Sequence, residues 1–284
     1  VVDIDLEKFF DTVNHHKLIN LIGKEIEDKR VVKLIWKYLK SGIMIGMQLI
    51  ETEEGTPQGG NLSPLLSNII LNELDKELEK RGHKFCRYAD DCNIYVKSIK
   101  AGDRVMTGIT EYIEKRLKLK VNQKKSGVGS PYERKFLGFN FHKGKDGKVK
   151  IRIHPKSIEK LKKKVRKIMP RKNERNIAEI IKELKPILQG WSNYYKITEL
   201  KIFEDIDGWI RRRMRQSIWK TWKRIRTRYD KLRKLGIKHI PAIQIANTRL
   251  GSWRVVHSPV LHQALPNEYF EKLGFRSLSS YSLI

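Results

Sequence analysis

Residues 85–97 read FCRYADDCNIYVK and predict a β-hairpin. Phe85–Tyr88 and Asn93–Lys97 are expected as two short strands, and Ala89-Asp90-Asp91 as the turn between them. Adjacent aspartates in a turn are common, because Asp forms local hydrogen bonds with its own backbone. They can also belong to a charged site. Which reading holds depends on the other side chains that the fold brings to this turn.

A third carboxylate stands at the end of a strand predicted at the start of the chain. In Val1–Leu6 the apolar residues share one face, and Asp3 and Asp5 share the other. If this strand neighbours the hairpin, Asp5, Asp90 and Asp91 converge at one sheet edge. Such a cluster repels itself unless divalent cations fill it. Mg²⁺, with Mn²⁺ as a substitute, suits carboxylates and substrate phosphates. Two such ions about 3.5–4 Å apart suit phosphoryl transfer on nucleotides.

Composition points to a polyanionic partner. The 284 residues hold 60 Lys and Arg against 32 Asp and Glu, a formal net charge of +28. This surplus favours nucleic acid, although a solvated basic surface or a binding protein without chemistry has the same composition. Cys86 and Cys92, the only cysteines, exclude a four-cysteine zinc site and fit a reducing compartment. No apolar run reaches the length of a membrane span, so no membrane partner is expected.

The first half of the chain mixes helices with short strands. Asn14 is expected to cap a helix that carries Leu18 and Ile22. Ser63 is expected to cap another helix, with Pro64 at its first position. The other predicted elements are helices at 31–39 and 103–117, a strand pair at 43–53, a glycine-rich loop at 55–60, and strands at 118–121, 135–141 and 149–153.

After Pro155 the chain becomes helical and very basic. Helices are predicted at 157–169, 174–191 and 202–226, and shorter helices from Gly236 onward. We expect an α+β fold. We expect three parts, residues 1–154, 155–228 and 229–284, with the first boundary near Pro155.

Five motifs in order resemble a known family. They are Asp5-Leu6-Glu7-Lys8-Phe9-Phe10-Asp11, Gly55-Thr56-Pro57-Gln58-Gly59-Gly60-Asn61-Leu62-Ser63-Pro64, Tyr88-Ala89-Asp90-Asp91, Asn122-Gln123-Lys124-Lys125-Ser126 and Phe136-Leu137-Gly138-Phe139. Together they resemble the reverse transcriptases encoded by group II introns, the intron maturases. The resemblance implies a right-hand polymerase palm, an antiparallel sheet with packed helices, followed by an α-helical thumb and maturase region. The last part, 229–284, would be a basic DNA- and RNA-binding region.

The downstream half narrows the resemblance. Residues 189–195 read QGWSNYY, residues 209–213 read WIRRR and residues 219–223 read WKTWK. These blocks resemble the maturase-specific thumb, which retroviral and retron enzymes do not carry. The family's fingers segment would precede Val1, so we expect an upstream segment to be missing. The lack of a cysteine-rich nuclease module resembles the endonuclease-lacking branch of the family.

The resemblance assigns roles to the residues around the carboxylates. Asp5, Asp90 and Asp91 are the implied metal ligands, joined by the carbonyl of Leu6. Phe10 is the implied gate, whose ring excludes a ribose hydroxyl by collision. The alternative for Phe10 is a place in the core.

Three other elements are expected around the substrate. The loop residues line the nucleotide and template side, where glycine permits close backbone approach, or form a plain turn. Lys125 stabilises or protonates the leaving pyrophosphate, or is one more surface lysine. The segment 136–139 holds the primer end, forms a core strand, or does both. The loop residues are Gln58, Gly59 and Gly60, and the primer-grip residues are Phe136, Leu137, Gly138 and Phe139.

Two basic segments are candidate RNA-binding surfaces. Residues 156–175 hold ten Lys and Arg against two Glu, and residues 211–233 hold eleven against one Asp. Trp219, Trp222 and Tyr229 suit base stacking, while the tryptophans equally suit a helix core. A solvated charged face is the general alternative. The candidate contacts are Lys162, Lys163, Lys164, Arg211, Arg212, Arg213, Lys220 and Lys223.

The resemblance implies an RNA-directed DNA polymerase, a nucleotidyltransferase that extends a DNA primer on an RNA template with dNTPs. It also implies intron RNA as a partner in splicing, target DNA for a mobile element, and a bacterial cytoplasm. A splicing factor that binds RNA without polymerase activity is one alternative, which the intact carboxylates disfavour. Another class of reverse transcriptase is a second, which the blocks at 189–195 and 209–223 disfavour.

Overall fold

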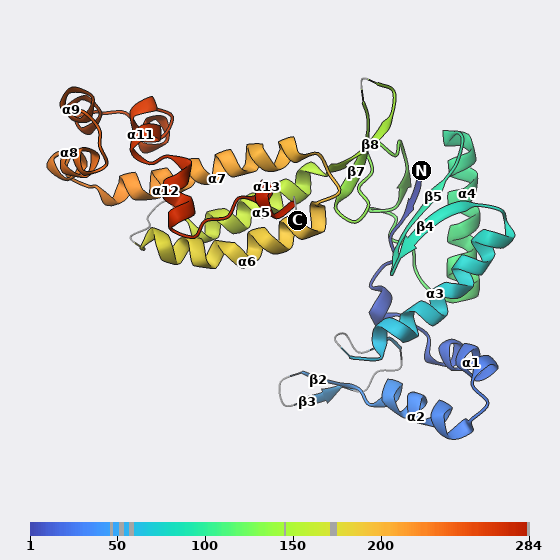
Figure 1. The fold of residues 1–284 in the computed structure, drawn as a ribbon. Helices are drawn as coiled ribbons and strands as arrows, with labels where there is room; N and C mark the ends of the chain where they lie inside the picture. Colours follow the sequence, from blue (N-terminus) through green and yellow to red (C-terminus); the bar gives the residue numbers. More distant parts are fainter. Residues whose placement is uncertain (46–47, 51–53, 57–59, 145, 171–174, 283–284) are drawn as a thin grey trace. The chain divides into compact units, whose positions relative to one another are not determined.

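The structure, a computed structural model, describes residues 1–45, 48–50, 54–56, 60–144, 146–170 and 175–282 (Figure 1). It divides into two compact units, Val1–Phe136 and Leu137–Ile284. Both combine antiparallel strand pairs with helices, which confirms the expected α+β class. The division reflects compactness alone, so the three predicted functional parts, residues 1–154, 155–228 and 229–284, stay a prediction.

A four-stranded antiparallel sheet organises the first unit, in the order β4-β5-β1-β6. Its strands are β1 (Val2–Ile4), β4 (Lys84–Tyr88), β5 (Asp91–Tyr95) and β6 (Gly127–Val128). Side chains alternate between the two faces of a sheet. One face is therefore apolar and buried, and the other carries polar residues. The buried face comprises Val2, Ile4, Cys92 and Ile94.

Helices pack on the apolar face of this sheet (Figure 1). α3 (Ser63–Lys80) presents a stripe at helical spacing, and α4 (Ile99–Tyr112), continued by a π-helical turn at Ile113–Leu117, adds Ile109. Burying each such side chain contributes about 1.5–3 kcal/mol. The stripe of α3 comprises Leu66, Ile70, Leu74 and Leu78.

Two helix caps were predicted in the first unit, and the structure bears out one of them. The Asn14 side chain accepts a hydrogen bond from Lys17 N at 2.9 Å, which confirms the cap of α1 (His15–Glu25). The predicted cap at Ser63 is wrong. Leu62 precedes α3 without a side-chain cap bond, and Pro64 lies in the first turn. The further elements are the 3₁₀ turn η1 (Phe9–Asp11), α2 (Lys29–Lys40), β2 (Ile43–Ile45) and β3 (Gln48–Ile50).

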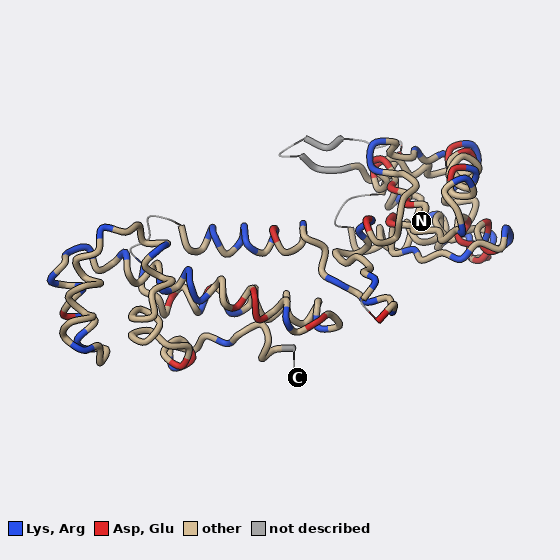
Figure 2. Tube along the Cα trace, turned by 90° about the horizontal axis from the view of Figure 1, so that it is seen from above, with Lys and Arg blue, Asp and Glu red and all other residues tan. Residues whose placement is uncertain are grey.

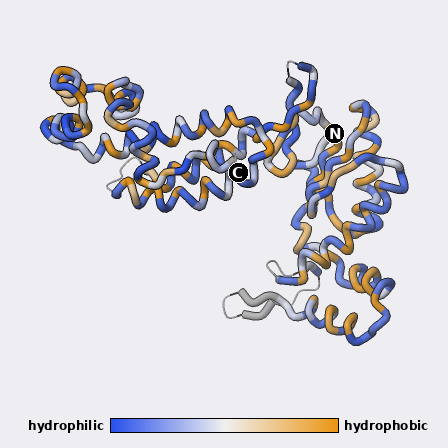
Figure 3. Tube along the Cα trace, viewed as in Figure 1, coloured by the Kyte–Doolittle hydropathy of each residue, from blue (hydrophilic) through white to orange (hydrophobic). Residues whose placement is uncertain are grey.

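The second unit is a hairpin followed by helices (Figure 1). β7 (Phe139–Lys143) and β8 (Val149–Ile153) pair antiparallel. The long helices are α5 (Pro155–Ile168), α6 (Ile177–Tyr195), α7 (Leu200–Thr221) and α8 (Ile225–Lys234). The short ones are α9 (His239–Ala246), α10 (Ser252–Val255), α11 (Pro259–Ala264), α12 (Asn267–Lys272) and α13 (Leu278–Ser282). Apolar positions recur along these helices (Figure 3) and form one core.

Two predicted elements of the second half differ from the structure. The helix predicted at 202–226 breaks at Trp222, whose carbonyl accepts a hydrogen bond from Arg228 Nε at 2.9 Å. Trp219 and Trp222 are both buried, so they belong to the core and do not stack on RNA bases. The strand predicted at 135–141 begins only at Phe139. No helix in the described ranges is long and apolar enough to cross a membrane.

Candidate active site

The sheet register brings two of the predicted metal ligands together. Ile4 of β1 pairs with Cys92 of β5 in an antiparallel register. Continuing this register by one position places Asp5, which follows β1, opposite Asp91, which precedes Cys92. Partial burial, and then the nearby carboxylates of Asp90 and Asp5, raise the pKa of Asp91 above its usual value. Asp91 is therefore close enough to Asp90 and to Asp5 for each of them to disfavour its ionised form. The first strand does neighbour the hairpin, which was the condition for the carboxylates to converge.

The carboxylate oxygens are the type of ligand that a hard divalent cation prefers. Asp5 Oδ1 is buried and accepts no hydrogen bond from any described residue, although Lys125 Nζ lies 3.3 Å away. A buried anionic oxygen without a hydrogen-bond donor, beside carboxylates that repel it, fits a divalent cation. As placed, no three His, Cys, Asp or Glu side chains of the described residues come close enough to hold one ion among them. The oxygen donors fit, and their final arrangement would have to form with the ion.

The turn at 122–126 holds the backbone of Asp5. Ser126 Oγ accepts a hydrogen bond from Asp5 N at 3.0 Å and donates one to Asp5 O at 3.2 Å. Asn122 N donates to the same carbonyl at 2.8 Å. Lys125 reaches the carboxylate itself, with Nζ 3.3 Å from Oδ1. Lys125 is thus brought to the site, and Ser126 is a supporting residue that the sequence did not single out for a role.

Leu6 is buried beside this turn. It forms an isolated antiparallel bridge with Val121. The hydrogen bonds that flank the bridge run from Glu7 N to Lys120 O and from Asn122 N to Asp5 O, each 2.8 Å long. Neither uses the carbonyl of Leu6. That carbonyl therefore stays compatible with the predicted metal contact.

Phe10 lies where the second motif docks. Its ring is half-buried and packs against Phe9, with centroids 5.3 Å apart, and its carbonyl accepts a hydrogen bond from Thr56 N at 2.6 Å. Gly55 has a φ of +93°, and a Cβ there would lie 2.9 Å from the carbonyl oxygen of Phe10. The loop therefore needs glycine for this close approach. Of its predicted binding residues, Gly60 is half-exposed, while Gln58 and Gly59 lie outside the described residues.

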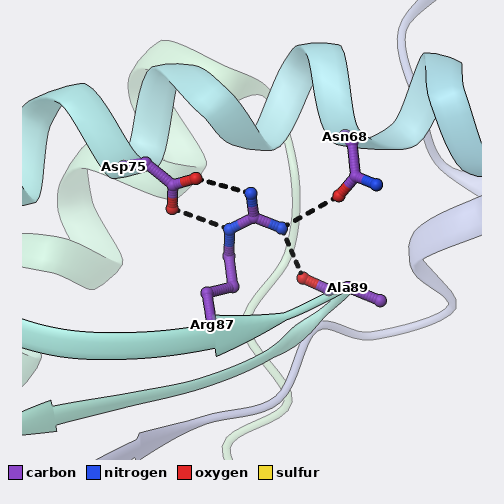
Figure 4. A network of polar contacts seen from close by, with 4 residues as sticks. All are labelled: Asn68, Asp75, Arg87 and Ala89. Atoms are coloured by element: carbon purple, nitrogen blue, oxygen red, sulfur yellow. Dashed lines mark hydrogen bonds and ion pairs between the residues drawn. The ribbon is translucent and has the colours of Figure 1, made fainter.

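The tip of the hairpin is a tight turn. Tyr88 pairs with Asp91, so Ala89 and Asp90 alone form the turn, and Asp91 belongs to β5 rather than to the predicted three-residue turn. Ala89 has a φ of +52°. A left-handed conformation costs an L-residue roughly 1–2 kcal/mol. Arg87, one residue before Tyr88, donates a hydrogen bond from Nη1 to the Ala89 carbonyl at 2.9 Å (Figure 4). The sequence did not single out Arg87.

Residues 137–139 of the predicted primer grip lie in the second unit, where aromatic residues of α6 hold them, while Phe136 ends the first unit. Leu137 has a φ of +51°, and Tyr194 Oη donates a hydrogen bond to its carbonyl at 2.9 Å. Gly138 has a φ of +85°, and a Cβ there would collide with the Tyr195 hydroxyl. Phe139 stacks on Tyr194 with ring centroids 5.6 Å apart. Residues 137–139 of one motif and Tyr194 and Tyr195 of another thus meet in one cluster.

Lys and Arg recur along the helices of the second unit (Figure 2), and most of the predicted RNA contacts belong to α5 and α7. Lys163 and Lys164 are exposed and border an open cavity of about 510 Å³ lined only by Lys and Arg among the described residues. Lys162 and Arg213 each place their cation within 5.6 Å of the Trp209 ring centroid. Arg211, Arg212, Lys220 and Lys223 lie on α7 or just beyond its end, and none of the four is buried.

Two known protein families match successive parts of the chain. The family described as reverse transcriptase (RNA-dependent DNA polymerase) matches residues 1–141, and the group II intron maturase-specific domain matches residues 158–236. The protein YkfC of Escherichia coli is 33% identical, covering 45% of this chain and 42% of that protein. The group II intron-encoded protein LtrA of Lactococcus lactis is 46% identical, covering 30% of this chain and 14% of that protein.

The chain thus spans less than half of the length of these two relatives. A solved structure of telomerase from Candida albicans, in complex with a fragment of telomeric RNA, has a TM-score of 0.49 and 14% identity, covering 96% of this chain and 50% of that chain. The two matched domains occur in the order that the motifs predicted. The chain belongs to the reverse transcriptase and maturase family that group II introns encode.

Proposed function

We propose that this chain carries the catalytic centre of an RNA-directed DNA polymerase. The reaction is attack of a primer 3′-hydroxyl on the α-phosphate of a dNTP, which forms the new phosphodiester and releases pyrophosphate. The observation that carries the proposal is the strand register that sets Asp5 opposite Asp91, with Asp90 in the adjoining turn. Such a transfer depends on positioning and on neutralising charge.

The residues of the sheet edge would divide this work. Asp5, Asp90 and Asp91, with the carbonyl of Leu6, would hold Mg²⁺ or Mn²⁺. When bound, the ions would make the primer hydroxyl more acidic and neutralise the phosphates. Lys125, whose ammonium reaches Asp5, would donate hydrogen bonds to the leaving pyrophosphate or protonate it.

The neighbouring elements would hold the substrates. Phe10 would lie beneath the sugar of the incoming nucleotide and exclude a ribose. Residues 58–60 would line the nucleotide and template side, and residues 136–139 would hold the primer end. The left-handed turn at Leu137 and Gly138 supports the last assignment, because it is fixed by Tyr194 from another motif.

The second unit would bind RNA and assist intron splicing. It carries 36 Lys and Arg against 12 Asp and Glu in residues 137–284. Its maturase-specific match and relatives encoded in group II introns support intron RNA as the partner. By the same reasoning target DNA would be bound during mobility, and the bacterial relatives support a bacterial cytoplasm.

Primer extension on an RNA template tests the proposal in the full-length protein. Asp5→Asn should lower Mg²⁺-dependent extension by about a thousandfold or more, because neutralising the reacting phosphates is worth several kcal/mol. Asp3→Asn is the matched control, since Asp3 shares the polar face but pairs with Arg134 at 3.7 Å. Its extension rate should stay within about threefold of wild type.

Two outcomes would overturn the polymerase proposal. Equal effects of Asp5→Asn and Asp3→Asn would remove the special role of Asp5. A wild-type protein that binds intron RNA and promotes splicing, yet extends no primer with Mg²⁺ or Mn²⁺, would establish the second candidate, a splicing factor without polymerase activity. The basic character of the second unit favours that candidate's RNA-binding half.

A further inference from the structure

The turn between the two strands of the hairpin is a strained element at the proposed site. Ala89 directly precedes Asp90, so its backbone angles set the direction in which the next residues leave the turn. With φ at +52°, it occupies a region that suits glycine. Two-residue hairpin loops with positive φ at the first position usually have Gly there. Conformations of this kind persist where the surroundings hold them.

Arg87 is placed to hold this turn. It lies on the helix-facing side of β4, opposite buried Cys92. Its Nε and Nη2 donate to Asp75 Oδ1 at 2.7 Å and Oδ2 at 2.5 Å, a two-point contact that fixes the guanidinium plane (Figure 4). Its Nη1 donates to Asn68 Oδ1 at 3.1 Å and to the Ala89 carbonyl at 2.9 Å.

Two of the three partners of Arg87 come from one helix. Asn68 and Asp75 are seven residues apart on α3, which is two turns of one helix face. The ion pair is largely shielded, with 12% of the Arg87 side chain and 21% of the Asp75 side chain exposed. A lysine would keep the charge but would lack the planar fork that reaches three partners at once. The arrangement therefore connects α3 to the carbonyl of the strained residue.

We propose that Arg87 is a positioning residue for the carboxylate turn: held by Asp75 and Asn68 on α3, it fixes the left-handed Ala89 and so aims Asp90 and Asp91. The inference rests on the proposed polymerase function for its catalytic consequence. Its structural part stands on the Arg87–Ala89 contact alone. If the Arg87–Asp75 ion pair only stabilised the fold, the loss of activity caused by replacing Arg87 would not depend on the residue at position 89.

Rescue by glycine separates these two roles. In the full-length protein, Arg87→Lys should lower the single-turnover extension rate by about tenfold to a hundredfold, as for a small misplacement of catalytic groups, with the dNTP KM within about threefold. Adding Ala89→Gly should restore about tenfold of that loss, because glycine adopts the left-handed conformation without help. Asn68→Ala, which leaves the ion pair intact, should cost about threefold to tenfold.

The control and the second readout keep the test independent of activity. Arg81 pairs with Glu77, also on α3, at 2.7 Å, so Arg81→Lys disturbs a comparable pair far from the turn. It should leave extension within about twofold. In metal-free protein, amide hydrogen exchange of residues 85–95 should speed up in Arg87→Lys and slow again in the Arg87→Lys/Ala89→Gly double variant.

Three results would overturn the inference. One is an Arg87→Lys variant with wild-type extension and wild-type exchange. Another is a folded double variant in which glycine restores neither. The third is an equal loss of extension in Arg81→Lys. If the wild type itself extended no primer, the polymerase proposal would fail, while the exchange measurement would still decide whether Arg87 holds the turn.

Discussion

The two compact units differ in charge far more than in architecture. Residues 1–136 hold 24 Lys and Arg against 20 Asp and Glu, whereas residues 137–284 hold 36 against 12. Nearly all of the net charge of +28 therefore belongs to the second unit, while the clustered carboxylates belong to the first. A large surplus of positive charge thus indicates a polyanionic partner without locating the chemistry.

The two units also share a structural feature, although different side chains form it. Each contains an L-residue in a left-handed turn whose carbonyl a side chain holds. In the first unit a guanidinium that is paired with a carboxylate holds Ala89, and in the second the phenol of Tyr194 holds Leu137. Charge-assisted hydrogen bonds are roughly twice as strong as neutral ones. The more strongly held turn is the one that carries the proposed metal ligands.

The largest expected contrast between the units is in RNA binding. If the second unit neutralises six to ten phosphates, affinity for intron RNA should fall by about 10³–10⁵ between 50 and 200 mM salt. Filter binding at several salt concentrations measures this slope. Replacing exposed Lys163 and Lys164 by Gln should reduce the slope by about two.

Two exposed lysines of the first unit serve as a control for the loss of two positive charges. Lys33 and Lys37 are exposed on α2. Replacing both by Gln removes the same charge and should change RNA affinity by less than about twofold. Equal effects of the two pairs would mean that net charge, and not the second unit, governs binding.

The next effect concerns the sugar of the incoming nucleotide. Phe10→Ala should raise incorporation of ribonucleotides relative to deoxynucleotides by about tenfold to a hundredfold, because the ring no longer collides with a 2′-hydroxyl. The ratio of kcat/KM for the matched dNTP and rNTP measures it. Phe9→Leu serves as the control, since Phe9 is 2% exposed and belongs to the core. Unchanged discrimination in Phe10→Ala would make Phe10 a packing residue only.

A smaller effect tests the turn in the second unit. Gly138→Ala should lower the free energy of unfolding by about 3 kcal/mol, because a left-handed alanine is strained and its Cβ meets the Tyr195 hydroxyl. Gly147 also has positive φ, at +73°, but nothing lies within 4 Å of a Cβ there. Gly147→Ala should therefore cost only about 1 kcal/mol. Similar losses in urea denaturation would show that residues 137–139 are not packed under α6 as described.

The sequence was sufficient where the pattern is local or alternates regularly. Alternation along the first strand was enough to place Asp5 at its end, whereas the pairing of that strand with β5 was a condition that the structure supplied. The Asn14 cap is likewise a local feature. The resemblance in motif order assigned roles to the site residues, and these roles stay a proposal.

The remaining contacts depend on tertiary register. Ser126 meets Asp5 across 121 positions, and Tyr195 meets Gly138 across a hairpin and a helix. Arg87 differs from the surrounding surface cations only because strand alternation turns it toward α3. The break at Trp222 was also not predicted. The predicted helix ran without interruption through 202–226, whereas α7 ends at Thr221 and Trp222 is buried.

If the carboxylates of the first unit carry the chemistry and the second unit carries the RNA affinity, a single Asp91→Asn preparation should separate the two properties. Its single-turnover primer extension with Mg²⁺ should fall by about a thousandfold or more, while its Kd for intron RNA should stay within about twofold of wild type. Extension at a near-normal rate by Asp91→Asn would show that these carboxylates do not carry the chemistry.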